Sequence, residues 1–374
     1  MSRMAKVYDR RKELGPPKPM ALDPLPEQPL VSILISNYNY AAFLGDAIES
    51  CLRQTYDKLE IIICDDGSTD GSPRILERYR SLDTRVRVIY QANGGQSLAM
   101  NTALQKSTGE VICLLDADDV FMPDKVQRVI DAFAAAPDSG FAVNRMVRVD
   151  AARNYLGDIP LLSALASGWM RPFLSLSAPH VASGLPPCSG LSLRRSVAAA
   201  IFPLPRRLTA YADTLIQVLG PLITTIAAIE TPLSEYRVHG SNVAAVREFT
   251  EGRLRNLAVY EREIWRAWRR FLASPVSGLP LNFPLPSKMP SSPMSYAYGR
   301  FRSPSSSRGD QQAISLDYFR TWPKSYRWYW RASSLMPNWL FRKSFAFMYG
   351  QTHAKVFLGK ILRVYRKGFR LCQQ

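Results

Sequence analysis

Three carboxylates follow directly on a short apolar run in the middle of the chain. Residues 110–119 read Glu-Val-Ile-Cys-Leu-Leu-Asp-Ala-Asp-Asp, so an apolar run leads into Asp116, Asp118 and Asp119. A continuous apolar run of this length indicates a central strand that is buried on both faces. Carboxylates crowded at the end of such a strand repel one another, and a divalent cation between them removes that repulsion. The pattern therefore predicts a site for a hard metal ion.

A helix N-cap is the simpler alternative for these acids. Aspartate is favoured at that position, and Pro123 suits the first turn of a following helix. A cap needs one carboxylate and this segment supplies three, which favours the metal site.

A second acidic cluster follows another apolar run. Residues 59–64 read Leu-Glu-Ile-Ile-Ile-Cys and lead into Asp65 and Asp66. The Asp65 carboxylate leaves the expected strand directly and is placed to accept hydrogen bonds from a nucleotide base or from ribose hydroxyls. Asp66 and the glycine after it also form a common turn sequence, and that alternative stays open. Asn37 and Tyr38 end a further apolar run, and an aromatic ring beside amides suits a stacked base.

Alternating strands and helices are needed to bring these acids together. Strands are expected at 31–36, 59–64, 86–90 and 110–115, and helices at 41–54, 72–82, 96–105 and 124–135. This alternation, with short turns, predicts an α/β fold, a doubly wound, mostly parallel sheet with helices on both faces. Parallel strands place their carboxyl ends at one edge of the sheet, where open α/β sheets bind ligands.

Composition and charge separate the chain into parts. The protein has 374 residues, 47% of them hydrophobic, and a formal net charge of +17. Residues 318–374 hold twelve Lys and Arg and no Asp or Glu, so the other 317 residues carry +5. Five cysteines without CxxC spacing indicate a reduced protein. The N-terminus has no apolar core of a secretory signal, and we expect a cytoplasmic location, with peripheral binding to the inner face of the cell membrane.

Five segments are expected along the chain. They are a flexible arm at 1–28, the catalytic domain at 29–243, a helical extension at 244–273, a Pro/Ser-rich linker at 274–311 and a basic aromatic segment at 312–374. Basic and apolar residues of 354–372 fall on opposite sides of a helix, which favours an anionic membrane surface. Packing of the apolar side on the catalytic domain is the alternative.

Four motifs in order carry a resemblance to a known family. They are VSILISNYN from residue 31, IIICDDGSTDGS from 61, NGGQSLAMNTAL from 93 and STGEVICLLDADDVFMPDK from 107. Together they resemble the nucleotide-sugar glycosyltransferases of family 2, which have the GT-A fold, over about residues 29–243. The resemblance implies an inverting, hexosyltransferase-type transfer from a nucleotide-diphosphate sugar with Mg²⁺ or Mn²⁺, in polysaccharide or glycolipid biosynthesis. The acceptor is then a carbohydrate or a lipid-linked glycan.

The resemblance also implies roles for individual residues. Asp118 and Asp119 would hold the metal together with His239 of the Tyr-Arg-Val-His element at 236–239. Asp213 would be the catalytic base, although an acid early in a helix also suits the helix dipole. The residues expected to bind the nucleotide and the rest of the donor are Asn37, Tyr38, Asp65, Asp66, Asn93, Gly95, Asn101 and Asp116.

Two other kinds of function stay open at this point. Ala212 stands where the family often has Glu, and Met100 where it often has Arg, so a degenerate member acting only as a binding module is one alternative. The sequence pI of about 9.8 makes nucleic-acid binding the other. No zinc finger, helix-turn-helix or Gly-rich phosphate loop is present in the sequence, which disfavours nucleic acid.

Overall fold

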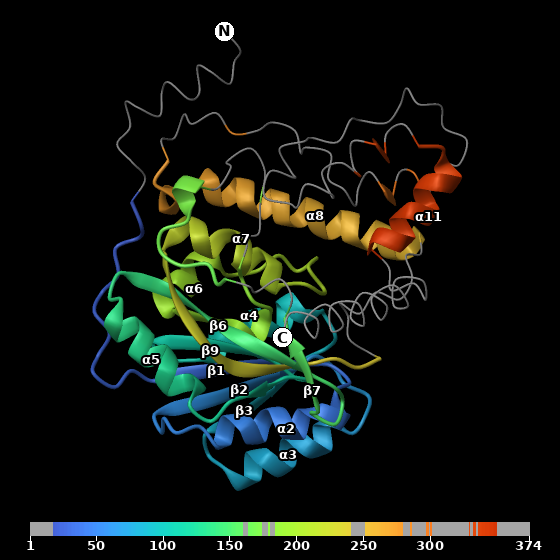
Figure 1. Cartoon of the computed structure of the whole chain (residues 1–374). Coiled ribbons are helices and arrows are strands. Elements are labelled where there is room, and N and C mark those ends of the chain that lie inside the picture. The colour runs from blue at the N-terminus through green and yellow to red at the C-terminus, as the bar shows by residue number, and fades with distance from the viewer. Residues whose placement is uncertain are drawn as a thin grey trace, which may run out of the picture. The chain divides into compact units, whose positions relative to one another are not determined.

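In the computed structural model (Figure 1), the chain divides into two compact units. Unit 1 comprises Met1–His239 and Glu263–Ser287, and unit 2 comprises Gly240–Arg262 and Lys288–Gln374. The structure describes residues 18–159, 164–173, 179, 184–240, 251–279, 285, 297–298, 300, 329, 332–333 and 336–349. Every residue that the sequence assigns to the site therefore lies within the described part of unit 1. The basic segment 354–372 lies outside the described residues.

A nine-stranded sheet forms the centre of unit 1, in the order β3-β2-β1-β4-β8-β6-β9-β5, with β7 paired to β6. The strands β1 to β4 run parallel, as do β6 and β9, whereas β5, β7 and β8 pair antiparallel. The predicted α/β class with a mostly parallel sheet is confirmed. The strands are β1 Val31–Asn37, β2 Leu59–Asp65, β3 Val86–Tyr90, β4 Val111–Asp116, β5 Val120–Phe121, β6 Ser139–Val149, β7 Tyr155–Asp158, β8 Leu191–Arg194 and β9 Thr225–Arg237.

Helices cover both faces of this sheet. One face packs against α2, α3 and α5, and the other against α4, α6 and α7 (Figure 1). The helices are α2 Ala41–Leu52, α3 Ser72–Leu82, α4 Gln96–Lys106, α5 Lys125–Ala135, α6 Arg195–Ile201, α7 Asp213–Ile223, α8 Glu251–Leu272 and α11 Asn338–Tyr349. Short 3₁₀ turns occur at Arg171–Phe173, Cys188–Gly190 and Pro275–Ser277. No helix in the described parts of the chain is long and apolar enough to span a bilayer.

The apolar runs become the middle of the sheet because both of their faces are covered. Alternate residues of β1, such as Ile33 and Ile35, face Leu44 and Ile48 of α2 in one core cluster. Leu34 of the same strand, on the other face, is also buried. Burial on both sides explains why β1, β2 and β4 read as continuous apolar runs rather than as alternating ones.

The segment before β1 differs from the expected flexible arm. The Met20 N–H donates to the Ile223 carbonyl, and the Arg194 guanidinium donates to the Asp23 carbonyl. Pro29 accepts a hydrogen bond from the Tyr56 hydroxyl. Residues 20–29 therefore lie along unit 1, because their backbone carbonyls and amides find partners on three elements; residues 1–17 lie outside the described part.

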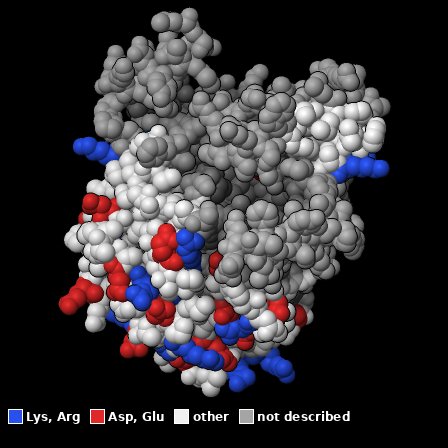
Figure 2. Space-filling view, in the orientation of Figure 1, with Lys and Arg blue, Asp and Glu red and all other residues white. Residues whose placement is uncertain are grey.

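Figure 2 shows how charged side chains are distributed on one face of unit 1. Over its lower part, which holds α2 and α3 in the orientation of Figure 1, blue Lys and Arg interleave with red Asp and Glu. Ion pairs such as Arg53–Glu49 and Arg80–Glu77 are part of this mixed surface. A mixed surface of this kind lacks the one-signed stripe typical of nucleic-acid binding.

Candidate active site

The acidic residues of two strands meet at one edge of the sheet. In the register of the parallel strands, Ser36 lies opposite Asp116 and Asn37 lies opposite Asp65. The carboxylates of Asp116, Asp118 and Asp119 each offer an oxygen, and these oxygens all lie within 4.8 Å of one another. We call these three residues the acid rim. Its closeness follows from the turn after β4, in which the Asp119 N–H donates to the Asp116 carbonyl at 3.1 Å.

Burial and mutual repulsion favour protons on the acid rim. Desolvation, followed by the negative charges of Asp118 and Asp213, raises the pKa of Asp116 to about 8. Burial is also the first cause that raises the pKa of Asp119 well above its usual range, with Asp118 and Asp116 next. A cation placed among these groups would reverse both effects, since it stabilises the ionised form of each carboxylate.

A serine from a distant turn holds two members of the acid rim. The Ser189 hydroxyl donates to Asp119 Oδ2 at 2.6 Å and accepts the Asp116 N–H at 3.0 Å. Ser189 itself is fully buried, and its carbonyl accepts the Ser234 hydroxyl at 2.7 Å. Sequence reasoning did not name Ser189 as a site residue, although its hydroxyl contacts two of the acids.

The end of β9 supplies the other contacts of the acid rim. His239 Nε2 lies 3.0 Å from Asp118 Oδ2, so the structure brings these two predicted metal ligands together. The His239 ring packs on Phe43, with ring centroids 4.4 Å apart, and its side chain is almost completely buried. The Arg237 N–H donates to Asp119 Oδ1 at 2.9 Å. The end of β9 and the residues directly after it therefore supply two contacts to the acid rim. The Arg237 N–H binds Asp119, and the His239 ring lies beside Asp118.

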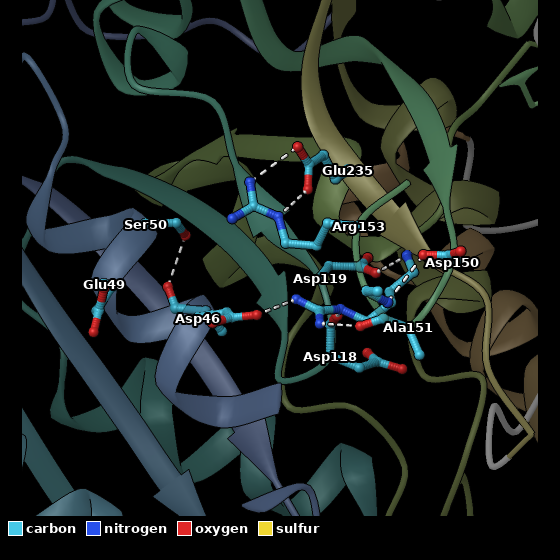
Figure 3. A network of polar contacts seen from close by, with 12 residues as sticks. Asp46, Glu49, Ser50, Asp118, Asp119, Asp150, Ala151, Arg153 and Glu235 are labelled. Carbon is cyan, nitrogen blue, oxygen red and sulfur yellow. Dashed lines mark hydrogen bonds and ion pairs between the residues drawn. The ribbon is translucent and has the colours of Figure 1, made fainter. Parts of the chain in front are cut away.

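The Arg237 side chain ties the acid rim to the first helix of the domain. Its Nε donates to the Asp118 carbonyl at 2.8 Å and its Nη2 to Asp46 Oδ2 at 2.7 Å (Figure 3). Its Nη1 donates to the carbonyl of Ala151 at 3.0 Å, and its guanidinium lies over the Phe43 ring. This buried guanidinium therefore fixes the backbone of Asp118 from outside the cluster, a role that the sequence pattern did not indicate.

Asp213 lies at the first position of α7 beside the acid rim. Burial raises its pKa, while hydrogen bonds from backbone N–H groups, first that of Thr214, oppose the rise. Its charge in turn contributes to the raised pKa of Asp116, after burial and the charge of Asp118. Tyr211, two residues earlier, has a φ of 55°, a left-handed conformation that turns the chain into the helix.

Gln96 connects the acid rim to the start of α7. Its Nε2 donates to Asp116 Oδ1 at 3.4 Å, and its Oε1 accepts the Ala212 N–H at 3.1 Å. Sequence reasoning missed this residue because a glutamine at the first position of an expected helix carries no distinctive signal. Its contacts run to residues that lie 20 and 116 positions away.

The predicted base-binding residues form a compact polar cluster. Asn37 Nδ2 donates to Asp65 Oδ1 at 2.6 Å, and the Ser68 hydroxyl donates to the same oxygen at 2.6 Å. Asp65 Oδ2 accepts the Ser68 N–H at 3.0 Å. Tyr38 is 45% exposed, so its ring is open to a stacking partner. Sequence reasoning did not name Ser68 as a site residue, although it belongs to this cluster through its contacts with Asp65.

Asp66 organises the glycine loop before α4. Its carboxylate accepts the N–H of Gly94 at 3.0 Å, the N–H of Gly95 at 2.7 Å and the side chain of Gln91 at 2.6 Å. Gly95 has a φ of 88°, and a Cβ there would lie 2.5 Å from Thr209 Cα, so glycine is required. Asn93 is exposed in the same loop. The contacts indicate that Asp66 supports the loop.

Asn101 is used inside the protein. Its Nδ2 donates to the Leu204 carbonyl at 2.9 Å, and its Oδ1 accepts the Leu204 N–H at 2.7 Å. Both polar atoms of the amide are thereby engaged by one backbone residue. Asn101 therefore holds the segment that leads to Asp213, and its two hydrogen bonds go to the Leu204 backbone and not to the acid rim.

The part of the chain that contains the acid rim matches a known protein family. Residues 32–187 match the family model described as Glycosyl transferase family 2. An uncharacterized glycosyltransferase of Nostoc sp. is 36% identical over 220 residues, covering 57% of this chain and 66% of that protein. The putative glycosyltransferase EpsH of Bacillus subtilis is 30% identical over 232 residues, covering 58% of this chain and 63% of that protein. The chain thus spans just under two thirds of both relatives.

Shorter and more distant likenesses extend this picture. Chondroitin synthase of Escherichia coli is 46% identical over 105 residues, which is 28% of this chain and 15% of that protein. Among solved structures, S. aureus TarS 1-349 in complex with UDP-GlcNAc aligns with a TM-score of 0.54. That alignment covers 87% of this chain and 93% of the other at 16% identity, and it supports the fold alone.

Proposed function

We propose, from the premise that this chain carries a family 2 glycosyltransferase domain of the GT-A fold, that it transfers a sugar from a nucleotide-diphosphate sugar to an acceptor hydroxyl. The observation that carries the proposal is the acid rim with Asp213 beside it. Carboxylates so close together require a bound cation to be ionised at once, and a separate carboxylate next to them can accept a proton. A growing polysaccharide is the acceptor class that the likeness to chondroitin synthase supports.

The residues of the acid rim fit Mg²⁺ or Mn²⁺. Hard cations take carboxylate oxygens, and three of these lie within 4.8 Å of one another with raised pKa values on two residues. Asp118, Asp119 and His239 would hold the ion, and Asp116 would bind the donor. When bound, the ion supplies a Lewis acid that stabilises the departing nucleoside diphosphate.

Asp213 is the group proposed to accept the proton of the acceptor hydroxyl. Burial raises its pKa, which makes its carboxylate a stronger base than an exposed one. Its place at the start of α7, held through Ala212 and Gln96, fixes it relative to Asp116. Attack from the face of the sugar opposite the diphosphate would invert the anomeric carbon.

Nucleotide binding is proposed at the polar cluster of Asn37, Asp65 and Ser68, with Tyr38 stacking on the base. Both Asp65 oxygens accept hydrogen bonds within the protein, and we expect the remaining lone pair of Oδ2 to accept one from a base N–H or a ribose hydroxyl. The TarS structure was solved with UDP-GlcNAc, so uridine diphosphate sugars are the first donors to test.

A thermal-shift experiment tests the proposal as a whole. We expect uridine diphosphate or another nucleoside diphosphate to raise the melting temperature in the presence of Mn²⁺, and to raise it much less without the ion, because binding to the folded state alone stabilises it. A screen in which no nucleoside diphosphate shifts the transition, with or without Mn²⁺, would contradict it. Binding of the nucleotide sugar without transfer to any acceptor would leave a binding module.

Removal of the Ser189 hydroxyl is expected to weaken Mn²⁺ binding. Ser189→Ala deletes the hydrogen bonds to Asp119 Oδ2 and from the Asp116 N–H, and loss of such an outer contact lowers metal affinity about 10-fold or more. Calorimetric titration of Mn²⁺ measures the change. Ser192→Ala is the matched control, since Ser192 is equally buried but contacts Cys113 Sγ. Equal Mn²⁺ affinity in both variants would remove the role given to Ser189.

The metal-free protein is expected to lose stability as the pH rises. The folded-state pKa of Asp116 is raised from 3.8 to about 8, so this group favours folding below pH 4, and the contribution is lost as the pH rises from about 4 to about 8. The raised pKa values of Asp119 and Asp213 act in the same direction. The pKa of Lys125, lowered to about 8 by burial, gives no slope below that pH.

Mn²⁺ should offset this loss, because it binds the ionised acids. The upward shift of the melting temperature on adding Mn²⁺ is therefore expected to be larger at pH 8 than at pH 6. Thermal melts at both pH values, with NaCl in place of the metal salt as the control, measure the difference. A shift that shrinks as the pH rises would contradict the assignment of the acid rim.

A further inference from the structure

The C-terminal half of α8 lines a cavity of unit 1 that the proposed reaction does not use. The cavity measures about 470 Å³, a volume within the range of small-ligand sites. All of its walls lie within residues 263–287 of unit 1. Its lining includes Trp265, Arg266, Arg269, Arg270, Ala273 and Leu285.

Positive charge dominates this cavity. Arg266, Arg269 and Arg270 are spaced three and four residues apart, which puts their side chains on one side of the helix. The Glu263 carboxylate accepts a hydrogen bond from Arg266 at 2.7 Å and lies 3.7 Å from a guanidinium nitrogen of Arg207. In the part of the chain that the structure describes, no ion pair joins Arg269 or Arg270 to a carboxylate. Arg266 and Arg207 thus share the Glu263 carboxylate, and Arg269 and Arg270 add further positive charge to the cavity.

Apolar surface and unused donors lie beside these charges. The Arg269 guanidinium is 4.8 Å from the centroid of the Trp265 ring, and Trp265 is 9% exposed. The indole N–H of Trp265 and the Nε of Arg269 are buried and find no hydrogen-bond partner among the described residues. Buried donors without partners are uncommon and cost stability unless a ligand or water meets them. Ala273 and Leu285 add apolar wall to the same cavity.

The helix dipole accounts for only part of this arrangement. Arg269 and Arg270 lie in the last turn of α8, where positive side chains stabilise a helix. That effect explains their charge. It does not explain a cavity at the same place, nor the buried indole N–H, for which the described residues supply no acceptor.

We propose that this cavity binds a phosphate group that carries an apolar chain, and that this amphiphilic phosphate is part of the acceptor. Guanidinium groups and an indole N–H suit phosphate oxygens, and the apolar wall suits the hydrocarbon next to them. The Arg207–Glu263 ion pair joins the cavity to the segment 204–212, which leads into Asp213. Only the acceptor assignment rests on the proposed function; binding of the ligand does not.

Calorimetric titration of the full chain with decyl phosphate, kept below its micelle concentration, tests the proposal. Inorganic phosphate and the uncharged decyl maltoside are the other two probes. We expect decyl phosphate to bind at least about tenfold more tightly than either, because only it offers both the charge and the chain. Decyl phosphate that binds no better than inorganic phosphate would overturn the proposal.

Charge reversal on the helix supplies the matched comparison. Arg270→Glu is expected to weaken binding of decyl phosphate about tenfold, because it replaces an exposed, unpaired guanidinium with a repelling charge. Arg262→Glu, at an exposed position outside the cavity on the same helix, should leave the affinity unchanged. Arg270→Gln should give a smaller loss in the same direction. Equal losses in Arg270→Glu and Arg262→Glu would assign the effect to general charge and overturn the cavity site.

Binding of uridine diphosphate with Mn²⁺, measured on the same preparations, separates the two proposals. We expect Arg270→Glu to keep that binding, since neither the acid rim nor the polar cluster of Asn37, Asp65 and Ser68 is among the residues that line the cavity. Wild-type protein that binds decyl phosphate but no nucleotide would refute the transferase while supporting the cavity. Protein that binds nucleotide but no decyl phosphate would refute the cavity site while supporting the transferase.

Discussion

Asp118→Asn is expected to reduce sugar transfer about 10³-fold or more. The substitution removes one carboxylate charge from the acid rim while keeping a side chain of the same shape beside His239 Nε2. A metal ion contributes several kcal/mol to a developing negative charge, and each ~1.4 kcal/mol is a factor of ten in rate. Steady-state transfer from the donor found by the thermal-shift screen, with Mn²⁺ titrated for each protein, measures the loss.

The same variant should be more stable than the wild type without metal. The Asp118 charge raises the pKa of both Asp116 and Asp119, so its removal relieves repulsion in the folded state. We therefore expect a higher melting temperature without Mn²⁺ and a smaller shift on adding it. Asp131→Asn, at an exposed helical position, is the control and should change neither quantity. Normal metal-dependent turnover by Asp118→Asn would remove this residue from the metal site.

Asp213→Asn is expected to abolish transfer while leaving donor binding intact. A positioned general base contributes about 10²- to 10⁴-fold, and the amide cannot accept the acceptor proton. Because Asp213 lies outside the acid rim, the Mn²⁺-dependent binding of uridine diphosphate should persist. The signature is thus a low turnover number with an unchanged dissociation constant for the nucleotide, read from kinetics and calorimetry on one preparation.

The control for this variant is another acid at a helix start. Asp124 lies at the N-cap position of α5, is partly exposed and forms an ion pair with Arg128. Asp124→Asn should leave both transfer and binding unchanged. If Asp213→Asn transferred sugar at the wild-type rate, the carboxylate would only stabilise the first turn of α7, and another group would have to take the proton.

Much of the fold was accessible from the sequence because the strands around the acid rim are buried on both faces. The continuous apolar runs of β1, β2 and β4 are typical of strands buried on both faces. The acids that follow them mark the carboxyl edge of the sheet. The strand β6 gave no such signal, since its eleven residues mix charged and apolar side chains. The second half of the strand β9 pairs with β5 and the distal part of β6, which only the folded chain brings beside it.

The contacts that support the acids were not accessible in the same way. Ser189, Gln96 and Arg237 reach their partners only after the chain has folded, across separations of 20 to 191 residues. A serine or glutamine has no spacing rule that points to such a contact. Lys125 shows the same limit: it is a charged residue in an expected helix, yet it is fully buried and donates to Asn144 and the Ser189 carbonyl.

The Gln96 amide has a consequence for the order of events. One side chain donates to Asp116 and accepts from the residue next to Asp213, so it contacts both the acid rim and the start of α7. A donor sugar that occupies Asp116 Oδ1 must displace the amide nitrogen, and the start of α7 then loses part of its tether. We expect the acceptor side to open only after the donor is in place, an ordered sequence that would protect the activated sugar from water.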